Sequence, residues 1–406
     1  MTTDQPFDRV HDRTLPATPA TPATPATPVP DSGTPAPDSG TPAPSLTVVI
    51  CAYTVERWDD LRAAVASVRA QHRPPAETLL VVDHCPELLR LAREQLSAGL
   101  RILPNSRRRG LSGARNTALA AARGELIAFL DDDATADPAW TERLLAGYRT
   151  PDVLGVGGHV RPWWLSGRPG WFPPEFDWVV GCSYRGLPDR PAPVRNFIGA
   201  NMSFRRAPAL AAGGFRTDLG RVGRRPLGCE ETELCIRLSA RHPGAELRYE
   251  PSAAVRHRVP PARTTFSYFA ARCFAEGRSK AAVVRHDGAT AGLASERAYL
   301  RHTVPAALLR SLRRGHPVMA AALCAGVALT AAGYLTGVAG GRAVRTAPRR
   351  TGAVRPATDG EPAVGEPGGI RPTTRATTAE PATVRPTAAR PATARATGTG
   401  TTGSGP

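Results

Sequence analysis

The stretch "ELIAFLDDDAT" (residues 125–135) runs from an apolar segment straight into three carboxylates. The apolar residues 126–130 predict a buried β-strand, and Asp131, Asp132 and Asp133 follow it directly. Three adjacent negative charges are costly at such a point unless a cation neutralises them. Because Mg²⁺ takes oxygen ligands and shares them with substrate phosphates, the stretch predicts a divalent-cation site for a phosphorylated ligand. A solvated acidic turn is the alternative interpretation.

Strand-like and helix-like segments alternate around this stretch. Apolar runs predict strands, and segments with helical apolar spacing lie between them: strands at 45–51, 78–83, 100–103 and 125–130, helices at 56–71, 86–96 and 111–124. Continuous apolar runs between helices predict an α/β fold, with a mostly parallel sheet covered by helices on both faces. Ligands of such sheets bind beyond the carboxyl ends of the strands, where residues 51–53, Asp83 and the three aspartates are expected. A further helix is predicted to begin at Asp137-Pro138, with Pro at its first position.

Both ends of the chain are of low complexity. Residues 1–44 repeat Pro, Ala and Thr, and residues 341–406 are rich in Arg, Thr, Pro and Gly, so we expect both tails to be disordered. The N-terminal tail also lacks the apolar core of a signal peptide. Seven cysteines, an odd number without a CxxC pair, favour a reducing compartment.

The formal net charge of +17 is carried almost wholly by arginine, because Lys280 is the one lysine in the chain. Such a charge would suit a nucleic-acid partner. No zinc-finger spacing, RNA-binding aromatic motif or heptad with a basic arm accompanies it, so we expect no nucleic acid.

The uncharged segment 318–340 is long enough to cross a hydrocarbon core of ~30 Å. It predicts one transmembrane helix, and a buried core helix is the alternative. Amphipathic helices at 261–317 are expected to extend a catalytic domain at 45–260. Arginines flank the apolar segment on both sides, so its orientation stays open. An enzyme that uses a cytosolic substrate would keep residues 45–317 inside the cell, on the cytoplasmic face of a single-pass anchor.

A second acidic cluster follows about a hundred residues after the first, in "CEETELCIRL" (229–238). Transfer of a group from a phosphorylated donor to a hydroxyl needs a stabilised leaving group, a base for that hydroxyl, and alignment of the two reactants. A metal site and a distant carboxylate supply the first two. The alternative interpretation is structural: these acids would only complement the dipole at the N-terminus of a helix.

Three alternative functions would also account for part of this arrangement of strands and acidic residues. Asp131-x-Asp133-x-Thr135 matches the nucleophile motif of haloacid-dehalogenase-type phosphohydrolases, although that motif normally follows the first strand and requires a downstream Lys. A nucleotidyltransferase would share the sheet and the metal, but it needs a Gly-rich phosphate loop, which "VICAYTVERW" (49–58) lacks. A non-enzymatic, Arg-rich scaffold for nucleic acid or a membrane surface is the third alternative.

Several motifs in order resemble the family 2 glycosyltransferases, which have the GT-A (Rossmann-like) fold, over residues 45–259. The resemblance rests on these stretches: "TVVICAYTVERWDDL" (47–61), "LLVVDH" (79–84), "GLSGARNTALAAARGELIAFLDDD" (110–133), "GANMSFRR" (199–206), "GCEETELCIRL" (228–238) and "VRHRV" (255–259). Each stretch alone is a weak signal, and the ordered set is specific.

The resemblance implies a role for individual residues. Those of the nucleotide-sugar site are Ala52, Tyr53, Glu56, Asp83, Arg115, Asp131 and Asp132. It implies that Asp133 and His257 bind Mg²⁺ or Mn²⁺, and that Asn201 touches the acceptor. Glu231 is implied as the general base, with Glu230 beside it. Many members have Asp where this chain has Glu231, so the choice among Glu230, Glu231 and Glu233 stays open.

The function implied is metal-dependent, inverting transfer of a sugar from a nucleoside-diphosphate sugar, with UDP the expected nucleotide. The predicted membrane segment favours a lipid-linked or other cell-envelope saccharide as the acceptor.

Overall fold

The computed structural model describes residues 44–219, 228–287 and 294–346. Of the tails predicted at 1–44 and 341–406, residues 1–43 and 347–406 lie outside these ranges, and residues 341–346 belong to the last helix. The strands are β1 (Leu46–Ala52), β2 (Glu77–Val82), β3 (Arg101–Pro104), β4 (Leu126–Asp131), β5 (Ala134–Ala136), β6 (Val153–Trp164), β7 (Ala192–Pro193), β8 (Asn201–Arg205) and β9 (Glu246–Val259). The α-helices are α1 (Trp58–Arg69), α2 (Pro86–Gln95), α3 (Leu111–Ala121), α4 (Trp140–Gly147), α5 (Arg206–Ala211), α6 (Glu230–Arg241), α7 (Phe266–Asp287), α9 (Ala294–Ala298), α10 (Val304–Arg313) and α11 (Pro317–Thr346). Short turns of 3₁₀-helix are η1 (Val55–Arg57), η2 (Pro174–Val180) and η3 (Pro261–Arg263), and η4 (Tyr299–Thr303) is a π-helical turn.

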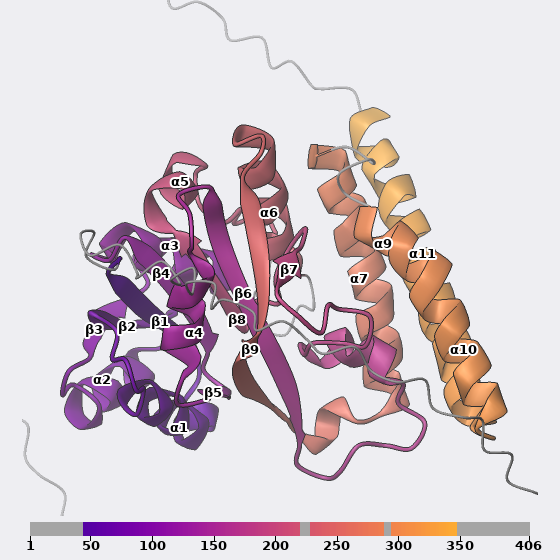
Figure 1. The fold of residues 1–406 in the computed structure, drawn as a ribbon, viewed down its shortest axis with the longest axis horizontal. Helices are drawn as coiled ribbons and strands as arrows, with labels where there is room; N and C mark the ends of the chain where they lie inside the picture. Colours follow the sequence, from indigo (N-terminus) through magenta and orange to yellow (C-terminus); the bar gives the residue numbers. More distant parts are fainter. Residues whose placement is uncertain (1–43, 220–227, 288–293, 347–406) are drawn as a thin grey trace, which may run out of the picture. The chain divides into compact units, whose positions relative to one another are not determined.

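The strands of the described residues form one sheet in the order β3-β2-β1-β4-β8-β6-β9-β5, with β7 paired to β9 (Figure 1). The predicted parallel pairing is confirmed for β3, β2, β1 and β4. Beyond β4 the sheet is mixed, because β8 runs antiparallel to both β4 and β6 while β6 and β9 are parallel. Segment 246–259 is the single long strand β9.

Helices cover both faces of the sheet, as the continuous apolar runs predict. Alternate residues of β1 enter different cores: Val48 and Ile50 pack with α1 and α2, whereas Val49 packs with α3 and α6. A strand buried on both faces has no place for polar side chains until it ends. This is why the polar residues of the candidate site gather at the strand ends.

The helix predicted at Asp137-Pro138 begins later than expected. Asp137 and Pro138 precede α4, which starts at Trp140, and the Trp140 backbone N–H donates to the Asp137 carbonyl at 2.9 Å. Trp140 is fully buried, so packing of its ring against the sheet sets the start of the helix.

The C-terminal helices α7, α10 and α11 lie together beside the sheet (Figure 1). Contacts advance in the same direction along α7 and α11, from Phe269 beside Gly326 to Arg285, whose guanidinium donates to the Gly337 carbonyl at 2.9 Å. The two helices are therefore parallel. Their backbones come very close: a Cβ added at Gly333 would lie 2.0 Å from the Phe274 carbonyl oxygen. Small residues of this kind allow close helix packing.

Within the described ranges, one helix is long and apolar enough to cross a membrane, Pro317–Gly340 of α11. Of its most apolar window, 28% is buried against the rest of the chain. Most of this window is therefore not buried, whereas a core helix would be mostly buried.

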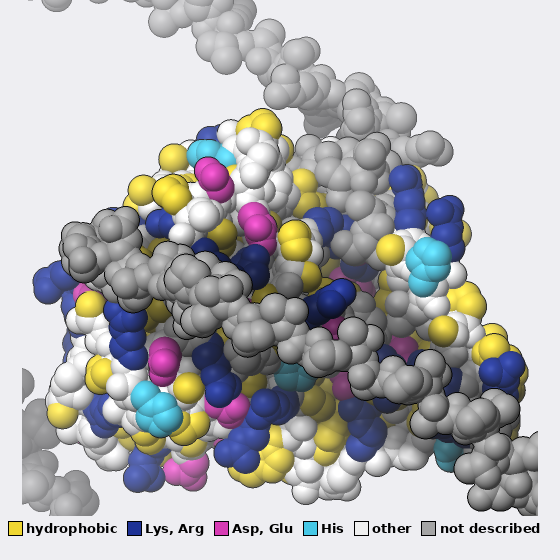
Figure 2. Space-filling view, viewed as in Figure 1, with side chains coloured by type: hydrophobic (Ala, Val, Ile, Leu, Met, Phe, Trp, Pro, Cys, Tyr) yellow, Lys and Arg dark blue, Asp and Glu magenta, His cyan; other side chains and the backbone are white. Residues whose placement is uncertain are grey.

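Arginine side chains are spread over the molecule rather than gathered in a single stripe. On the face shown in Figure 2, dark-blue side chains lie over the sheet region as well as over the C-terminal helices. Many of them make ion pairs across elements, such as Arg258 with Asp60 and Arg310 with Glu175.

We predict that Gly333→Ala destabilises the protein, because the added methyl group collides with backbone of α7 rather than with a flexible side chain. Overpacking of this kind costs about 1–3 kcal/mol. Gly340→Ala is the matched control, since a Cβ there meets nothing within 4 Å and Ala favours a helix by about 1 kcal/mol. Thermal unfolding followed by circular dichroism should show a lower Tm for the first variant only. Equal Tm values for the two variants would contradict the packing.

Candidate active site

The carboxylate stretch lies beside a histidine from a much later segment of the chain. β5 and β9 are antiparallel with Ala134 opposite His257, and the Arg258 backbone N–H donates to the Asp133 carbonyl at 2.9 Å. This pairing brings His257 Nε2 within 3.1 Å of Asp133 Oδ1. On its other side, His257 Nδ1 lies 3.7 Å from the thiol sulfur of the buried Cys182.

Two arginines also approach these acids. Arg57 Nη1, from η1, lies 2.7 Å from Asp132 Oδ1 and 3.2 Å from Asp133 Oδ2. Arg263 Nη2, from η3, lies 3.5 Å from Asp133 Oδ2. Burial acts to raise the pKa of Asp133, but His257, Arg57 and Arg263 outweigh it and hold that pKa well below its usual range. Burial and the adjacent charge of Asp133 raise the pKa of Asp132 to about 7, with Arg57 opposing them.

The same acids suit a divalent cation. One ligand atom each from Asp131, Asp133 and His257 lie within 4.8 Å of one another. Two carboxylate oxygens and one imidazole nitrogen form a donor set that Mn²⁺ and Mg²⁺ accept. In the described part of the chain, the buried Asp132 Oδ2 has no hydrogen-bond partner, which leaves an acceptor available beside this set. The residues present therefore fit the cation that the sequence predicts, with Asp131 in the donor set.

The predicted nucleotide loop follows β1. Ala52 is buried at the end of the strand, and its carbonyl accepts from the Asp83 N–H at 2.7 Å. Tyr53 is 42% exposed, and the guanidinium carbon of Arg57 lies 5.3 Å from the centre of its ring. Glu56 is exposed in η1. An exposed ring held by an arginine is available for contact with a base or ribose.

Asp83 lies at the end of β2 and is already hydrogen-bonded within the protein. Its Oδ1 accepts from Asn105 Nδ2 at 2.6 Å, and its Oδ2 accepts from the Gly110 N–H at 2.9 Å. Gly110 is the N-cap of α3, so Asp83 holds the loop that precedes this helix. Asn105 gave no signal in the sequence, because its contact with Asp83 exists only once β2 and β3 have paired.

Arg115 of α3 joins the two acidic clusters. It is 1% exposed; its Nη1 lies 2.9 Å from Glu230 Oε1, and its Nη2 lies 3.5 Å from Asp131 Oδ1. Its guanidinium carbon also lies 5.4 Å from the ring centre of Phe215 and 5.9 Å from that of Phe129. The sequence predicts Arg115 beside the donor, and the structure places it between Asp131 and Glu230.

The three glutamates at the start of α6 have different surroundings. Glu230 is buried and paired with Arg115, whereas Glu233 is buried and accepts from Arg237 Nε at 2.8 Å, away from the other acids. Glu231 is partly exposed and lines a cavity. Burial, followed by the charge of Glu230, raises the pKa of Glu231 to about 8, and Arg115 opposes the shift.

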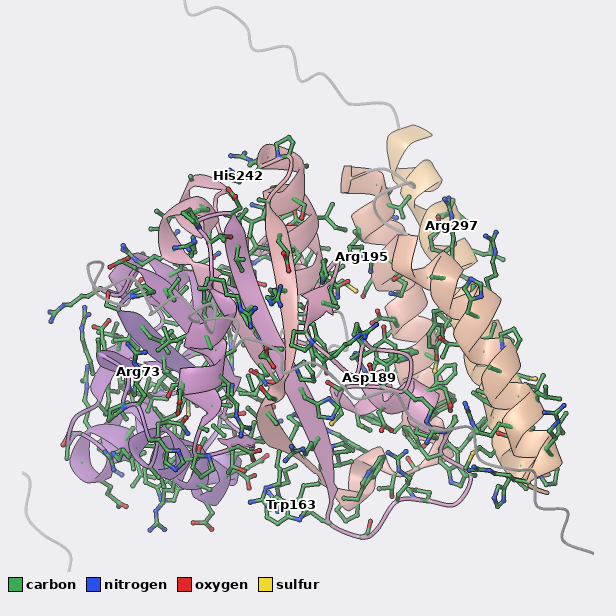
Figure 3. All side chains as sticks on the ribbon, in the orientation of Figure 1. Arg73, Trp163, Asp189, Arg195, His242 and Arg297 are labelled. Atoms are coloured by element: carbon green, nitrogen blue, oxygen red, sulfur yellow. The ribbon has the colours of Figure 1, made fainter. Side chains whose placement is uncertain are left out.

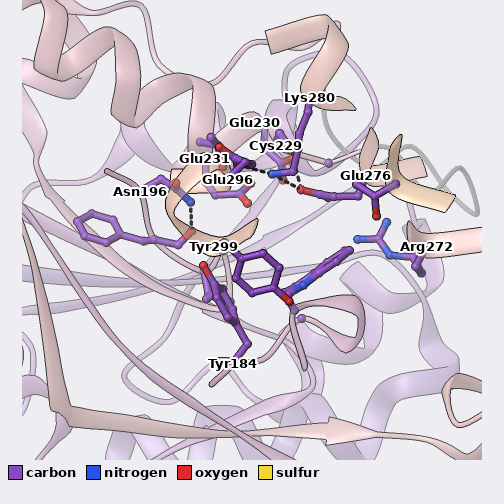
Figure 4. Close-up of a pocket in the computed structure, with 18 of the residues that line it drawn as sticks. Tyr184, Asn196, Cys229, Glu230, Glu231, Arg272, Glu276, Lys280, Glu296 and Tyr299 are labelled. Atoms are coloured by element: carbon purple, nitrogen blue, oxygen red, sulfur yellow. Dashed lines mark hydrogen bonds and ion pairs between the residues drawn. The ribbon is translucent and has the colours of Figure 1, made fainter. Parts of the chain in front are cut away.

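That cavity has a volume of about 430 Å³ (Figure 4). At one end it is lined by Arg115, Asp131, His257, Glu230 and Glu231. At the other end it reaches α11, where Val327, Thr330, Ala331 and Tyr334 line it. The acids of the sheet edge and of α6 therefore share one space, which continues to the apolar helix.

Asn201 lies apart from this cavity. It is fully buried, accepts from Trp140 Nε1 at 2.8 Å, and donates to the carbonyls of His159 and Ala253 at 3.0 and 2.8 Å. These bonds occupy its amide inside the sheet, where they join β8 to its neighbours. Asn201, which the resemblance implies as an acceptor contact, is thus fully buried with its amide engaged in these bonds.

Sequence reasoning did not single out Arg57, Arg263, Cys182 or the polar residues of α7 and α9 that line the cavity. Arg57 stood within the quoted nucleotide loop, and its position beside a predicted phosphate site was a signal that could have been used. The other residues come from segments whose approach depends on the packing of the C-terminal helices.

A sequence profile described as glycosyl transferase family 2 matches residues 47–210. The glucosyl-dolichyl phosphate glucuronosyltransferase of Haloferax volcanii is 36% identical over 238 residues, which are 58% of this chain and 76% of that relative. The chain belongs to glycosyltransferase family 2. A family 2 glycosyltransferase is an enzyme, so the alternatives of a scaffold, a phosphohydrolase and a nucleotidyltransferase are excluded.

This glycosyltransferase is also similar to the succinoglycan biosynthesis protein ExoM of Rhizobium meliloti, with 29% identity over 171 residues, 42% of this chain and 51% of ExoM. Among solved structures, the mannosyltransferase PcManGT from Pyrobaculum calidifontis, in complex with GDP-Man and Mn²⁺, has a TM-score of 0.44 and 20% identity, over 75% of this chain and 81% of that one. The family profile ends before Glu230, so α6, β9 and the C-terminal helices lie beyond it.

We predict that Asp133→Asn lowers the affinity for Mn²⁺ by about tenfold or more, because it removes a charged ligand from the proposed donor set. Asp132→Asn should have a smaller effect, since Asp132 lies outside the group formed by Asp131, Asp133 and His257. Asp59→Asn, at a side chain that is 92% exposed, serves as the control. Isothermal titration calorimetry measures the three affinities, and a thermal melt establishes that each variant is folded. Unchanged Mn²⁺ binding by folded Asp133→Asn would refute the site.

Proposed function

We propose that the chain transfers a sugar from a nucleoside-diphosphate sugar, with UDP as the nucleotide, to a hydroxyl of a lipid-linked saccharide, with inversion at the anomeric carbon. The observation that carries the proposal is the single cavity that holds the Asp131–His257 end, Glu231 and the apolar side of α11 together. The named relative from Haloferax volcanii acts, by its name, on glucosyl-dolichyl phosphate, which supports a lipid-linked acceptor.

The donor would be held by the residues at the edge of the sheet. Asp131, Asp133 and His257 would bind Mg²⁺ or Mn²⁺, which supplies positive charge to a departing diphosphate. Arg57 and Arg263 lie beside the same acids, where their guanidinium groups can contact phosphate oxygens. Tyr53, Asp83 and the rest of the loop after β1 are assigned to the nucleoside.

Glu231 is assigned as the general base. A base works best when its pKa lies near the working pH, and the carboxylate of Glu231 meets that condition while facing the cavity. It accepts the proton of the acceptor hydroxyl as the new C1–O bond forms and the bond from C1 to the diphosphate breaks. Arg115 positions Glu230 and Asp131, and so fixes the two ends of the reaction relative to each other. One base opposite one leaving group gives inversion.

We infer that the enzyme works at a membrane, on the cytoplasmic face where nucleotide sugars are made. The 24 residues Pro317–Gly340 extend ~36 Å as a helix, more than the ~30 Å of a hydrocarbon core. As part of the same proposal, α11 crosses the membrane once. The chain is divided into two tails that end and begin at residues 44 and 341, a catalytic domain at 45–260, a helical extension at 261–317 and a membrane helix at 318–340.

The donor can be identified without any acceptor. Purified protein with Mn²⁺ should hydrolyse one member of a panel of UDP-, GDP- and dTDP-sugars slowly, and omission of the metal should abolish the release of nucleoside diphosphate. The configuration of the transferred sugar, read from its anomeric proton by NMR, should be opposite to that of the donor. Retention of configuration, or turnover of no member of the panel, would reject the proposal.

The pH dependence tests Glu231. Protonation removes the base, so kcat should fall about tenfold per pH unit below the raised pKa of about 8 and reach a plateau above it. Glu231→Gln should lower kcat by roughly 10²–10⁴-fold and remove this dependence. Glu94→Gln, at an exposed pair with Arg90, is the control and should keep the wild-type profile. A flat profile below pH 8 in the wild type would exclude Glu231 as the base.

A further inference from the structure

Beyond Glu231 the cavity is walled by a network of ion pairs that the reaction does not use. Lys280 Nζ of α7 lies 2.6 Å from Glu296 Oε1 of α9 and 3.1 Å from Glu276 Oε1. Arg195 donates to both oxygens of Glu296, at 2.6 and 2.9 Å. Figure 3 shows Arg195 between the sheet and the C-terminal helices. All four side chains line the cavity.

The network is continuous with the catalytic acids. The thiol of Cys229 donates to Glu276 Oε1 at 3.4 Å, and Cys229 is the N-cap residue directly before Glu230 and Glu231. Any ligand held against this wall is therefore held beside the base.

These charges remain accessible from the cavity. The side chains of Lys280, Glu276, Glu296 and Arg195 keep 20%, 16%, 19% and 17% of their surface exposed. Ion pairs this deeply placed lose much of their attraction to desolvation, so stability alone is a weak reason for them. Their fixed geometry offers a ligand donors and acceptors that point in set directions.

The opposite wall is aromatic. Tyr184 and Tyr299 lie across from the charged group in Figure 4, with their ring centres 5.7 Å apart. Phe176 and Trp178 extend this wall. Flat rings on one side and oriented charges on the other match the two kinds of surface of a sugar ring, its C–H face and its hydroxyl edge.

Among the described residues that line the cavity, cations and carboxylates are equally numerous. The cations are Arg115, Arg195, Arg272, Lys280 and Arg297, and the carboxylates are Asp131, Glu230, Glu231, Glu276 and Glu296. An anion such as a phosphate would meet as many carboxylates as cations, so this lining favours a neutral, hydroxyl-rich ligand.

We propose that the Lys280–Glu276–Glu296–Arg195 wall and the facing tyrosines form the subsite that binds the acceptor's neutral saccharide, so that the enzyme extends a sugar rather than glycosylating a lipid phosphate directly. The inference rests on the proposed function for the chemistry it serves. It assigns acceptor recognition mainly to α7 and α9, which lie outside the part of the chain that matches the family profile.

The test measures binding without a donor. The full-length protein, kept in a detergent without a sugar headgroup, is titrated with octyl β-glucoside, octyl β-galactoside, octyl α-mannoside and octyl phosphate, and saturation-transfer NMR gives each Kd. At least one glycoside should bind more tightly than octyl phosphate. Glu296→Gln and Lys280→Met should each raise the Kd for that glycoside by about tenfold, which corresponds to the loss of one or two hydrogen bonds to charged groups. Octyl phosphate binding tighter than every glycoside would overturn the proposal.

Two controls separate recognition from folding. Glu94→Gln should bind the glycoside as the wild type does. Tyr184→Leu, on the aromatic wall, should also weaken binding while leaving the ion pairs in place. For every variant, Tm and slow donor hydrolysis without acceptor are measured. Variants that keep both but lose glycoside binding support the subsite, and variants that bind the glycoside like the wild type refute it. If the wild type fails to hydrolyse any donor, the proposed function is rejected. The binding test would still show whether this subsite binds a neutral saccharide.

Discussion

The candidate site depends on the ion pairs that the buried guanidinium group of Arg115 makes with two carboxylates. This group holds Asp131 at the end of β4 and Glu230 at the start of α6, two residues about a hundred positions apart in the chain. Removing either acid would leave a buried cation incompletely paired, and removing Arg115 would leave Glu230 as a buried charge, which is far more costly than losing a surface ion pair. The same contact keeps the Asp131 part and the α6 part of the cavity lining at a fixed separation.

Neighbouring acids in this protein differ through their surroundings rather than their chemistry. Glu230, Glu231 and Glu233 share one turn of helix, yet Glu230 is paired with Arg115, Glu233 is paired with Arg237, and Glu231 is partly exposed in the cavity. Asp132 and Asp133 divide in the same way, since His257 and Arg263 reach Asp133 while Arg57 is shared. Environment raises the pKa of Glu231 and of Asp132 and lowers that of Asp133, and so gives these carboxylates different capacities.

Sequence reasoning found what local patterns encode. The strands and helices up to β4, the carboxylates after β4, and the acids of α6 follow from apolar spacing and strand ends, and each lies where it was expected. The mixed pairing beyond β4, the late start of α4 at Trp140, and the burial of Asn201 depend on tertiary packing that no local spacing records. The ion-paired wall around Lys280 was invisible for the same reason: its partners come from separate segments, and the single lysine of the chain looked incidental.

The close fit of α7 against α11 joins two helices that both line the cavity. With backbone against backbone at Gly277 and Gly333, neither helix can slide along the other without parting. If the outside of α11 is held at a membrane, α7 is held with it, and the hydrogen bond from Cys229 to Glu276 of α7 connects the start of α6, where Glu231 lies, to the same two helices. The enzyme would then reach only those acceptor hydroxyl groups that lie at one fixed distance from the membrane plane in which α11 is anchored.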